Sequence, residues 1–213
     1  MNNNLNFKIL IINSGLGNIG SLINALEFLK FDVYQTDSYE FSQNIKYDGF
    51  ILPGVGSFPT GIKKIKEKHL DELVYKFIEN EIPGLGICLG MQLLAEFSLE
   101  GGVKSKGLNL FKGNVEKLNP LDNSKVPHIG WTDTKIFKCD EPWQIILNNA
   151  FYYVHSYAIN PKSDSSNLAY INYGKKNFTA AIYQKKLLGV QFHPEKSQQQ
   201  GLQLLNDYFN YHG

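Results

Sequence analysis

Short apolar runs alternate with a helical pattern in the first half of the chain, and this alternation limits the fold more than any other feature. The runs "FKILII" (7–12), "DVYQT" (32–36) and "YDGFILPG" (47–54) are predicted strands. Between the first two, apolar residues recur at helical spacing from Ile19 to Leu29. Nearly continuous apolar strands are typical of a parallel sheet that is buried on both faces. The pattern therefore predicts an α/β fold with a central, mostly parallel sheet flanked by helices.

The pattern changes about halfway along the chain, where predicted helices give way to short β-rich runs. Before that point, two further helical segments, "DELVYKFIEN" (71–80) and "LGMQLLAEFS" (89–98), lie on either side of the short apolar strand "GLGI" (84–87). Beyond it, runs such as "HIGWTDTKIF" and "FYYVHSY" are predicted to add β-hairpins and to finish the sheet, and "SQQQGLQLLNDYFNYH" is a predicted amphipathic helix. Because no repeat or linker interrupts the chain, we expect one domain spanning residues 1–213.

Composition gives no indication of a nucleic-acid or membrane partner. The 213-residue chain has a formal net charge of +1, with 43% hydrophobic and 19% charged residues, which is ordinary for a globular protein. Its two cysteines, Cys88 and Cys139, are too few for a disulfide framework, and no group of Cys and His has zinc spacing, so we expect neither a metal nor a cofactor. The start of the chain has no signal-peptide pattern and no apolar run of the roughly 20 residues that a membrane span requires, so we expect a cytoplasmic protein.

Cys88 lies in the segment "GLGICLGMQLL", between a short predicted strand and a helical run. Gly86 and Gly90 are small residues that let a chain turn sharply and present a nucleophile at the end of a strand, as in the Gly-x-Ser-x-Gly elbow. A helix that begins directly after Cys88 would stabilise its thiolate. The pattern therefore favours a nucleophilic cysteine over a buried structural one. Cys139 in "IFKCDEP" has no such surroundings and is interpreted as a bystander.

A thiol nucleophile requires a base, and the base requires a group that orients it. The segment "LLGVQFHPEKS" supplies His193 and Glu195, two residues apart at the end of an apolar run. This spacing places both side chains on one side of an extended chain. We therefore expect a catalytic triad of Cys88, His193 and Glu195, although the same segment by itself would be interpreted as a surface turn.

The glycine-rich turn in "ILPGVGSF" follows a predicted strand and is a candidate oxyanion site. A main-chain N–H group of Gly54, Val55 or Gly56 would stabilise an oxyanion together with the amide of Leu89, the residue after the candidate nucleophile. A plain strand-to-helix turn gives the same Pro-Gly-x-Gly pattern. This segment therefore supports the triad without establishing it.

A second glycine-rich turn, "GLGNIG" (15–20), matches the Gly-x-Gly-x-x-Gly pattern of dinucleotide-binding proteins. Asp37 lies close to where a ribose-binding acid is expected in such proteins. Nothing downstream repeats a second mononucleotide-binding half, however. We therefore interpret these glycines as the requirement of a tight turn between a strand and a helix.

Together, "LPGVGSF", "LGICLGMQLL" and "GVQFHPEKS" resemble the class I, triad-type glutamine amidotransferases. With "GLGNIGS", "VPHIGW" and "FYYVHSY" in this order, nearly the whole chain resembles the glutaminase subunits of imidazole glycerol phosphate synthase. The resemblance implies the class I glutamine amidotransferase fold and hydrolysis of L-glutamine to glutamate and ammonia, with Cys88 as nucleophile and His193, oriented by Glu195, as base and acid. It also implies that glutamine is held by Gln92, His155, Ser156 and Tyr157. A purely structural role for His155 is the alternative.

The resemblance further implies a partner and a pathway. In the family, ammonia passes to a (β/α)8-barrel subunit of the HisF type, which forms imidazole glycerol phosphate and an aminoimidazole carboxamide ribotide in histidine biosynthesis. Glutaminase activity in these subunits depends on the partner, so the isolated chain is expected to be nearly silent. Asn18 in the first loop and Trp131 in "GWT" are expected at the interface of this heterodimer.

Three alternatives stay open from the sequence. The first is a docking subunit without turnover, and the second is another cysteine hydrolase that shares the elbow. A third alternative keeps the chemistry and changes the acceptor, because paralogous subunits supply ammonia for the amination of surface-polysaccharide sugars. The chain departs from the histidine-pathway pattern at Asn13, Ser14 and Gly20, and Thr132 replaces the Asn of the family's "GWN". These departures concern the partner and the pathway, not the expected glutaminase chemistry.

Overall fold

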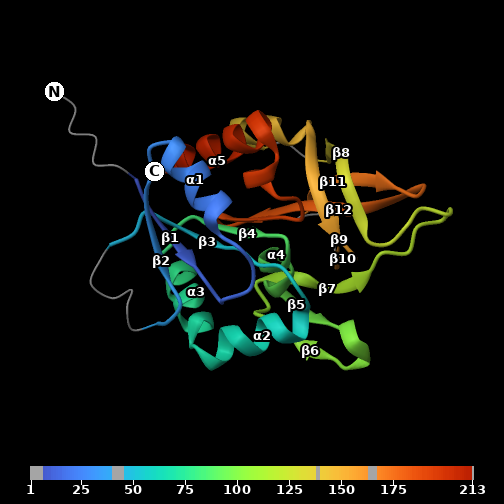
Figure 1. The fold of residues 1–213 in the computed structure, drawn as a ribbon, viewed down its shortest axis with the longest axis horizontal. Coiled ribbons are helices and arrows are strands. Elements are labelled where there is room, and N and C mark those ends of the chain that lie inside the picture. The colour runs from blue at the N-terminus through green and yellow to red at the C-terminus, as the bar shows by residue number, and fades with distance from the viewer. Residues whose placement is uncertain (1–6, 40–45, 138–139, 163–166, 213) are drawn as a thin grey trace.

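A nine-stranded sheet forms the middle layer of the computed structural model, which describes residues 7–39, 46–137, 140–162 and 167–212 (Figure 1). In sheet order the strands are β2 (Asp32–Thr36), β1 (Lys8–Ile12), β3 (Gly49–Leu52), β4 (Gly84–Ile87), β13 (Leu187–Val190), β12 (Lys176–Gln184), β11 (Asn167–Tyr173), β8 (His128–Ile136) and β9 (Ala150–His155). The first five pair in parallel, and each later pair is antiparallel. The sheet is therefore mixed, with its parallel half built mainly by the first half of the chain.

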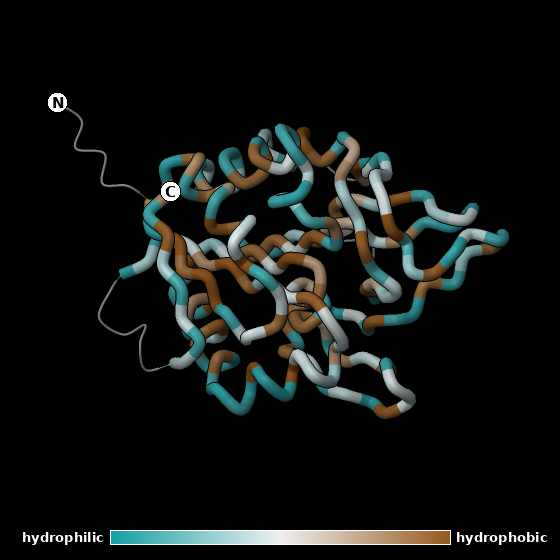
Figure 2. The backbone as a smooth tube through the Cα atoms, in the orientation of Figure 1, coloured by the Kyte–Doolittle hydropathy of each residue, from teal (hydrophilic) through white to brown (hydrophobic). Residues whose placement is uncertain are grey.

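Helices cover both faces of the parallel half (Figure 1). On one face lie α1 (Gly20–Phe28) and α5 (Gln198–His212), and on the other α2 (Phe58–Glu67) and α3 (Leu70–Glu79). Strand β1 is apolar because both of its faces are buried. Ile9 and Ile11 belong to one buried cluster, and Leu10 and Ile12 belong to another. Figure 2 shows hydrophobic residues along these central strands. None of the helices in the described part of the chain is long and apolar enough to cross a membrane.

Most predicted elements of the first half are confirmed. The strands expected over 7–12, 32–36 and 47–54 are β1, β2 and β3, and the run "GLGI" is β4. The helices expected after the first loop and before Pro83 are α1 and α3. The predicted α/β class is confirmed, and the later β-rich runs do finish the central sheet.

The helix predicted over residues 89–98 is wrong in its second half. Helix α4 spans only Leu89–Leu93, and the chain then enters β5 (Ala95–Ser98). Strand β5 belongs to a second sheet of the described residues, whose order is β10-β7-β5-β6. The other strands of this sheet are β6 (Ser105–Lys106), β7 (Phe111–Lys117) and β10 (Tyr157–Pro161). The Leu94 carbonyl accepts hydrogen bonds from the main-chain N–H groups of Leu110 and Phe111. Pairing with a distant segment thus replaces the next helical turn.

The parallel strands deliver four chain segments to one edge of the sheet. Strands β1, β3, β4 and β13 are neighbours and run in the same direction, so their carboxyl ends meet there. The segments that follow them begin at residues 13, 53, 88 and 191. Short 3-10 helices adjoin this region, namely η2 (Glu100–Gly102) and η5 (Pro194–Lys196), and a third, η3 (Pro142–Leu147), packs against α5. Every segment in which the sequence predicts catalytic residues therefore reaches this edge.

Candidate active site

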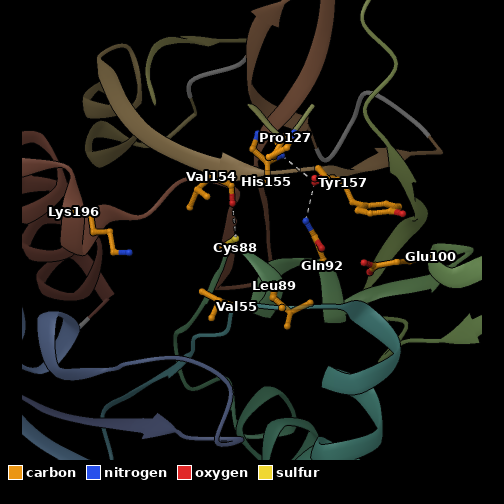
Figure 3. Close-up of a pocket in the computed structure, with 12 residues that line it drawn as sticks. Val55, Cys88, Leu89, Gln92, Glu100, Pro127, Val154, His155, Tyr157 and Lys196 are labelled. Carbon is orange, nitrogen blue, oxygen red and sulfur yellow. Dashed lines mark hydrogen bonds between the residues drawn. The ribbon is translucent and has the colours of Figure 1, made fainter. Parts of the chain in front are cut away.

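Cys88 lies at a sharp turn between β4 and α4. Its main chain has φ 52° and ψ −111°, a conformation that side-chain-bearing residues rarely adopt. A Cβ atom on Gly90 would lie 1.7 Å from the Leu52 carbonyl oxygen, and one on Gly86 would lie 2.9 Å from Met91 Cα. Both glycines are therefore required by close backbone approach, as the elbow pattern predicts. The turn places the Cys88 sulfur at the floor of a pocket (Figure 3).

His193 and Glu195 form a buried pair beside this turn. His193 Nδ1 lies 2.7 Å from Glu195 Oε1, and the two side chains are 4% and 10% exposed. Burial alone would lower the pKa of His193, but interactions with Cys88 and Glu195 outweigh burial and raise the pKa to about 9. His193 Nε2 is buried and has no hydrogen-bond partner among the described residues. The structure thus brings together the three residues of the expected triad and leaves the outer ring nitrogen available for a proton.

A pocket of about 450 Å³ opens over Cys88 (Figure 3). Seven residues that the sequence assigns to oxyanion or glutamine binding line it, namely Val55, Gly56, Leu89, Gln92, His155, Ser156 and Tyr157. Gly54 does not line this pocket but a smaller cavity of about 30 Å³, which also contacts His193 and Glu195. Four lining residues were not expected from the sequence, namely Glu100, Pro127, Val154 and Lys196. The pocket therefore contains almost the whole predicted set, together with one acidic and one basic side chain.

Two of the expected oxyanion donors are engaged in main-chain hydrogen bonds. The Leu89 N–H group donates to the Gly54 carbonyl and the Val55 N–H group donates to the Leu16 carbonyl, each at 3.3 Å. Gly17 also approaches Val55 closely, because a Cβ on Gly17 would lie 2.9 Å from Val55 Cγ2. The first loop therefore holds the turn after β3 in a conformation in which the Val55 amide is not offered to the pocket.

The first loop itself is organised by its asparagines and glycines. Asn13 Oδ1 accepts from the Gly15 N–H group and Asn18 Oδ1 from the Gly20 N–H group, each at 2.9 Å. Gly15 and Gly17 have positive φ values of 78° and 107°. These contacts and positive φ values are those of a tight turn between a strand and a helix, which gives Gly15 and Gly17 a structural role. Residues 16–19 of the loop line the small cavity beside His193 and Glu195.

The carbonyl of Tyr157 collects two side-chain donors. It accepts from Gln92 Nε2 at 2.8 Å and from His155 Nδ1 at 2.9 Å. A carbonyl oxygen can only accept, so His155 carries its proton on Nδ1 and its Nε2 accepts from His128 Nδ1 at 3.1 Å. His128 Nε2 then accepts from the Thr132 hydroxyl at 2.8 Å. Burial lowers the pKa of both histidines to about 4, so both imidazoles are neutral at physiological pH.

Two further residues that the sequence singles out are Trp131 and Cys139. Trp131 lies on β8 with 46% of its surface exposed, and its ring contacts that of Tyr152. Cys139 falls outside the described residues. In the described part of the chain, no group of three or more His, Cys, Asp or Glu side chains could hold a metal ion. Sequence reasoning missed Lys196, which directly follows the triad glutamate, and Gln191, which shares the alternating spacing of His193 and Glu195.

Comparisons with known proteins agree with this geometry. The family "Glutamine amidotransferase class-I" matches residues 10–210. The chain is 40% identical to imidazole glycerol phosphate synthase subunit HisH of Caldanaerobacter subterraneus subsp. tengcongensis over 200 residues, which cover 93% of this chain and 95% of the relative. It is 38% identical to the subunit of the same name from Aquifex aeolicus over 203 residues, which cover 94% and 95%.

Solved structures show the same fold at low sequence identity. The structure of PurLQS from Thermotoga maritima matches with a TM-score of 0.75 at 18% identity and covers 97% of this chain and 99% of its own. A crystal structure of a glutamine amidotransferase matches with a TM-score of 0.70, also at 18% identity, over 96% and 98%. The fold, the family match and the identity to these relatives agree: this chain belongs to the class-I glutamine amidotransferase family, in the group of subunits named HisH.

Proposed function

We propose that this chain is the glutaminase subunit of an imidazole glycerol phosphate synthase, which hydrolyses L-glutamine to glutamate and ammonia. The observation that carries the proposal is the buried pair of His193 and Glu195 beside Cys88: Cys88 lines the pocket, the pair lines the small cavity that shares Val55 with it, and His193 interacts with Cys88. The family match and the names of the relatives support it independently of the site.

The side chains of the triad have complementary roles in this reaction. His193 Nε2 holds the proton of the Cys88 thiol, as its raised pKa favours, and the thiolate attacks the carboxamide carbon of glutamine. His193 then returns the proton to the leaving nitrogen, so that ammonia departs and a thioester remains on Cys88. Water, deprotonated by His193, hydrolyses the thioester to glutamate and restores the thiol. Glu195 keeps the ring oriented and stabilises the imidazolium through the bond to Nδ1.

The pocket offers polar groups for the amino-acid end of glutamine. Gln92, His155, Ser156 and Tyr157 line it, and Glu100 adds a carboxylate that fits an α-ammonium group. Glu100 is held by a hydrogen bond from the Phe58 N–H group at 2.7 Å, so its position is fixed before glutamine binds. We assign polar contacts with glutamine to Gln92, Ser156, Tyr157 and Glu100, and a packing contact to His155, whose ring nitrogens are engaged by Tyr157 and His128. We assign oxyanion binding to the Leu89 amide, once it leaves the Gly54 carbonyl, with one amide from Gly54, Val55 or Gly56.

A glutamine analogue that carries an electrophilic diazoketone tests the chemistry directly. It should alkylate Cys88, with a mass increase confined to the peptide that contains this residue, and glutamine in excess should protect. His193→Asn should slow the alkylation strongly, because the thiol then lacks its proton acceptor. Labelling elsewhere in the chain, or no protection by glutamine, would favour a docking subunit or a different cysteine hydrolase.

We infer that ammonia is passed to a (β/α)8-barrel partner of the HisF type. Ammonia released into water would be protonated at neutral pH and lose its nucleophilicity, so the reaction is useful only in a closed complex. Asn18 and the exposed Trp131 are our candidates for the contact surface, because the first loop borders the triad and Trp131 presents a large apolar side chain to solvent.

The isolated chain should have little glutaminase activity. An oxyanion donor from Val55 requires its N–H group to leave the Leu16 carbonyl, and the Leu89 N–H group must likewise leave the Gly54 carbonyl. We expect turnover to rise at least about a hundredfold when the partner and its ligand are added, since one oxyanion donor accounts for roughly that factor. Steady-state glutaminase assays with and without the partner measure this, and vigorous turnover by the chain alone would contradict the proposal.

The compound that accepts ammonia in the partner distinguishes the histidine pathway from the amination of a surface-polysaccharide sugar. The relatives named HisH support the first, while Asn13, Ser14 and Gly20 were the residues that suggested the second. Co-purification identifies the barrel that binds this chain, and the ligand of that barrel that activates glutamine hydrolysis identifies the acceptor. Activation by a ribonucleotide supports histidine biosynthesis, whereas activation by a sugar nucleotide alone would overturn it.

A further inference from the structure

Gln191 is a buried polar side chain that the proposed mechanism does not use. It follows β13 directly, is fully buried, and its Nε2 lies 3.6 Å from Cys88 Sγ. It alternates along the chain with His193 and Glu195, while Phe192 between them stacks in the core against Phe151. Gln191 is therefore presented to the nucleophile from the same segment that supplies the base.

The hydrogen-bond network fixes which end of the Gln191 carboxamide faces the sulfur. Gln92 Nε2 donates to the Tyr157 carbonyl at 2.8 Å and to Gln191 Oε1 at 2.9 Å. If Gln191 were rotated, its NH2 group would face the Gln92 NH2 group, and two donors would meet. Rotating Gln92 as well would place its oxygen against the Tyr157 carbonyl, where two acceptors would meet. The main-chain carbonyl thus directs an N–H group of Gln191 at Cys88.

The neighbours of the sulfur respond differently to its charge. The Val154 carbonyl lies 3.9 Å from Cys88 Sγ and can accept from a thiol, but it can only repel a thiolate (Figure 3). The N–H group of Gln191 is a donor and favours the thiolate. Helix α4 has only five residues, so its dipole contributes little at its start. The Gln191 N–H group therefore supplies part of the thiolate stabilisation that the sequence predicts from a longer helix.

We propose that Gln191 is a further catalytic residue, whose side-chain N–H group donates to Cys88 Sγ and stabilises the thiolate before glutamine is attacked. This inference rests on the proposed function, since it assumes that Cys88 is the nucleophile. The proton of the thiol moves to His193 Nε2, and the Gln191 proton stays on its nitrogen throughout. Because Gln191 is held by Gln92, the pocket that receives glutamine is connected to the nucleophile by two carboxamides.

The ionisable groups that face Cys88 come from several elements. His193 and Glu195 follow β13, and His155 ends β9. Glu100 and Lys196 line the same pocket from η2 and η5. A carboxamide does not titrate, so replacing Gln191 removes a donor without removing any of these titrating groups. A change in the pH profile of Cys88 then reports the lost donor.

The test is the pH dependence of Cys88 alkylation by iodoacetamide, measured by mass spectrometry on the full chain, with Gln191→Met and Gln191→Leu as variants. We expect each to raise the midpoint of the profile by about one pKa unit, which is a tenfold slower alkylation at pH values below both midpoints. Gln144→Met is the matched control: Gln144 is equally buried, but its carboxamide oxygen accepts from the N–H groups of residues 140 and 141. Its midpoint should equal that of the unaltered chain.

A second measurement needs no variant. The side-chain amide signals of Gln191 in the ¹⁵N-labelled unaltered chain should shift with the same midpoint as the alkylation profile. Signals that stay constant, or a folded Gln191→Met with an unshifted midpoint, would overturn the inference. Failure of the proposed function looks different, because Cys88 would then show an ordinary thiol midpoint near about 8.5 that His193→Asn leaves unchanged.

Discussion

At the scale of single residues, Gly90 is a position where the main chain leaves no room for a side chain. Gly90 lies in α4, and a Cβ atom there would lie 1.7 Å from the Leu52 carbonyl oxygen at the end of β3; both residues are buried and the nearby atoms belong to the main chain, so no flexible side chain can give way. We expect Gly90→Ala to lower the free energy of unfolding by on the order of 3 kcal/mol. Gly20→Ala is the control, because the atoms near its new Cβ belong to the Asn18 side chain; its effect should stay below about 1 kcal/mol. Urea unfolding of both variants measures this, and equal effects would contradict the close packing of the elbow.

His193 makes a second prediction at this scale. Its pKa in the folded chain, about 9, is above the value for an unfolded histidine, so the folded state binds the proton more tightly. The resulting stabilisation is fully present below about pH 6.5 and is lost as the pH rises through about 9. Glu195→Gln removes part of it, so the stability difference from the unaltered chain should be on the order of 2 kcal/mol at pH 6 and shrink toward pH 10. Thermal unfolding across this range measures it, with the exposed Glu79→Gln as control; a difference that does not vary with pH would contradict the pairing.

The function of a single residue can be predicted from the sequence when it depends on residues nearby in the chain. Cys88 could be predicted from its flanking glycines, and His193 and Glu195 from their alternation. Gln191 could have been found by the same alternation, but a lone Gln carries no chemical signal until its bonds to Gln92 and the sulfur are known. Glu100 lines the pocket because of the positions of β5 and η2 in the fold, and no local sequence pattern predicts those positions.

At the scale of elements, the predicted secondary structure is wrong where long-range pairing decides the conformation. The run after Cys88 has a helical period, but β5 pairs with β7 and β6, which lie further along the chain. Helix α2 was not predicted, because Pro59 and Gly61 weaken a helical pattern by propensity. Gly61 is nonetheless suited to its place, since a Cβ there would lie 3.1 to 3.2 Å from the Leu89 and Leu93 side chains of α4. Packing against α4 thus overrides the weak local preference.

The pair of strands β8 and β9 carries a prediction about acid stability. His128 and His155 lie opposite each other in this pair and are neutral in the folded chain, with pKa values lowered to about 4 by burial. The unfolded chain binds protons at these positions below about pH 6.5, so stability should fall between pH 6.5 and 4, by on the order of 3 kcal/mol for each imidazole. His128→Asn should flatten this part of the profile relative to His69→Asn, which changes an exposed histidine. Equal slopes in the two variants would show that the pair does not titrate as described.

At the scale of the whole molecule, the layered arrangement explains why distant segments form one site. The parallel strands bring the turns after β1, β3, β4 and β13 to the same edge, and β9 and η2 complete the pocket from the side. The α/β class could be predicted from apolar periodicity. The four-stranded second sheet could not, because its strands come from segments as far apart as 95–98 and 157–161. The expectation of one domain stays a prediction.

The assignment of a glutaminase that feeds a separate synthase is tested most directly by Cys88→Ala in complex with the barrel partner. Synthesis is measured with glutamine and, in parallel, with an ammonium salt as nitrogen donor. We predict that glutamine-dependent synthesis falls at least about a thousandfold, because the nucleophile is lost, while ammonium-dependent synthesis is unchanged, because the partner carries it out. Retention of glutamine-dependent synthesis would show that Cys88 is not the nucleophile, and loss of both activities would contradict the division of labour between the two subunits.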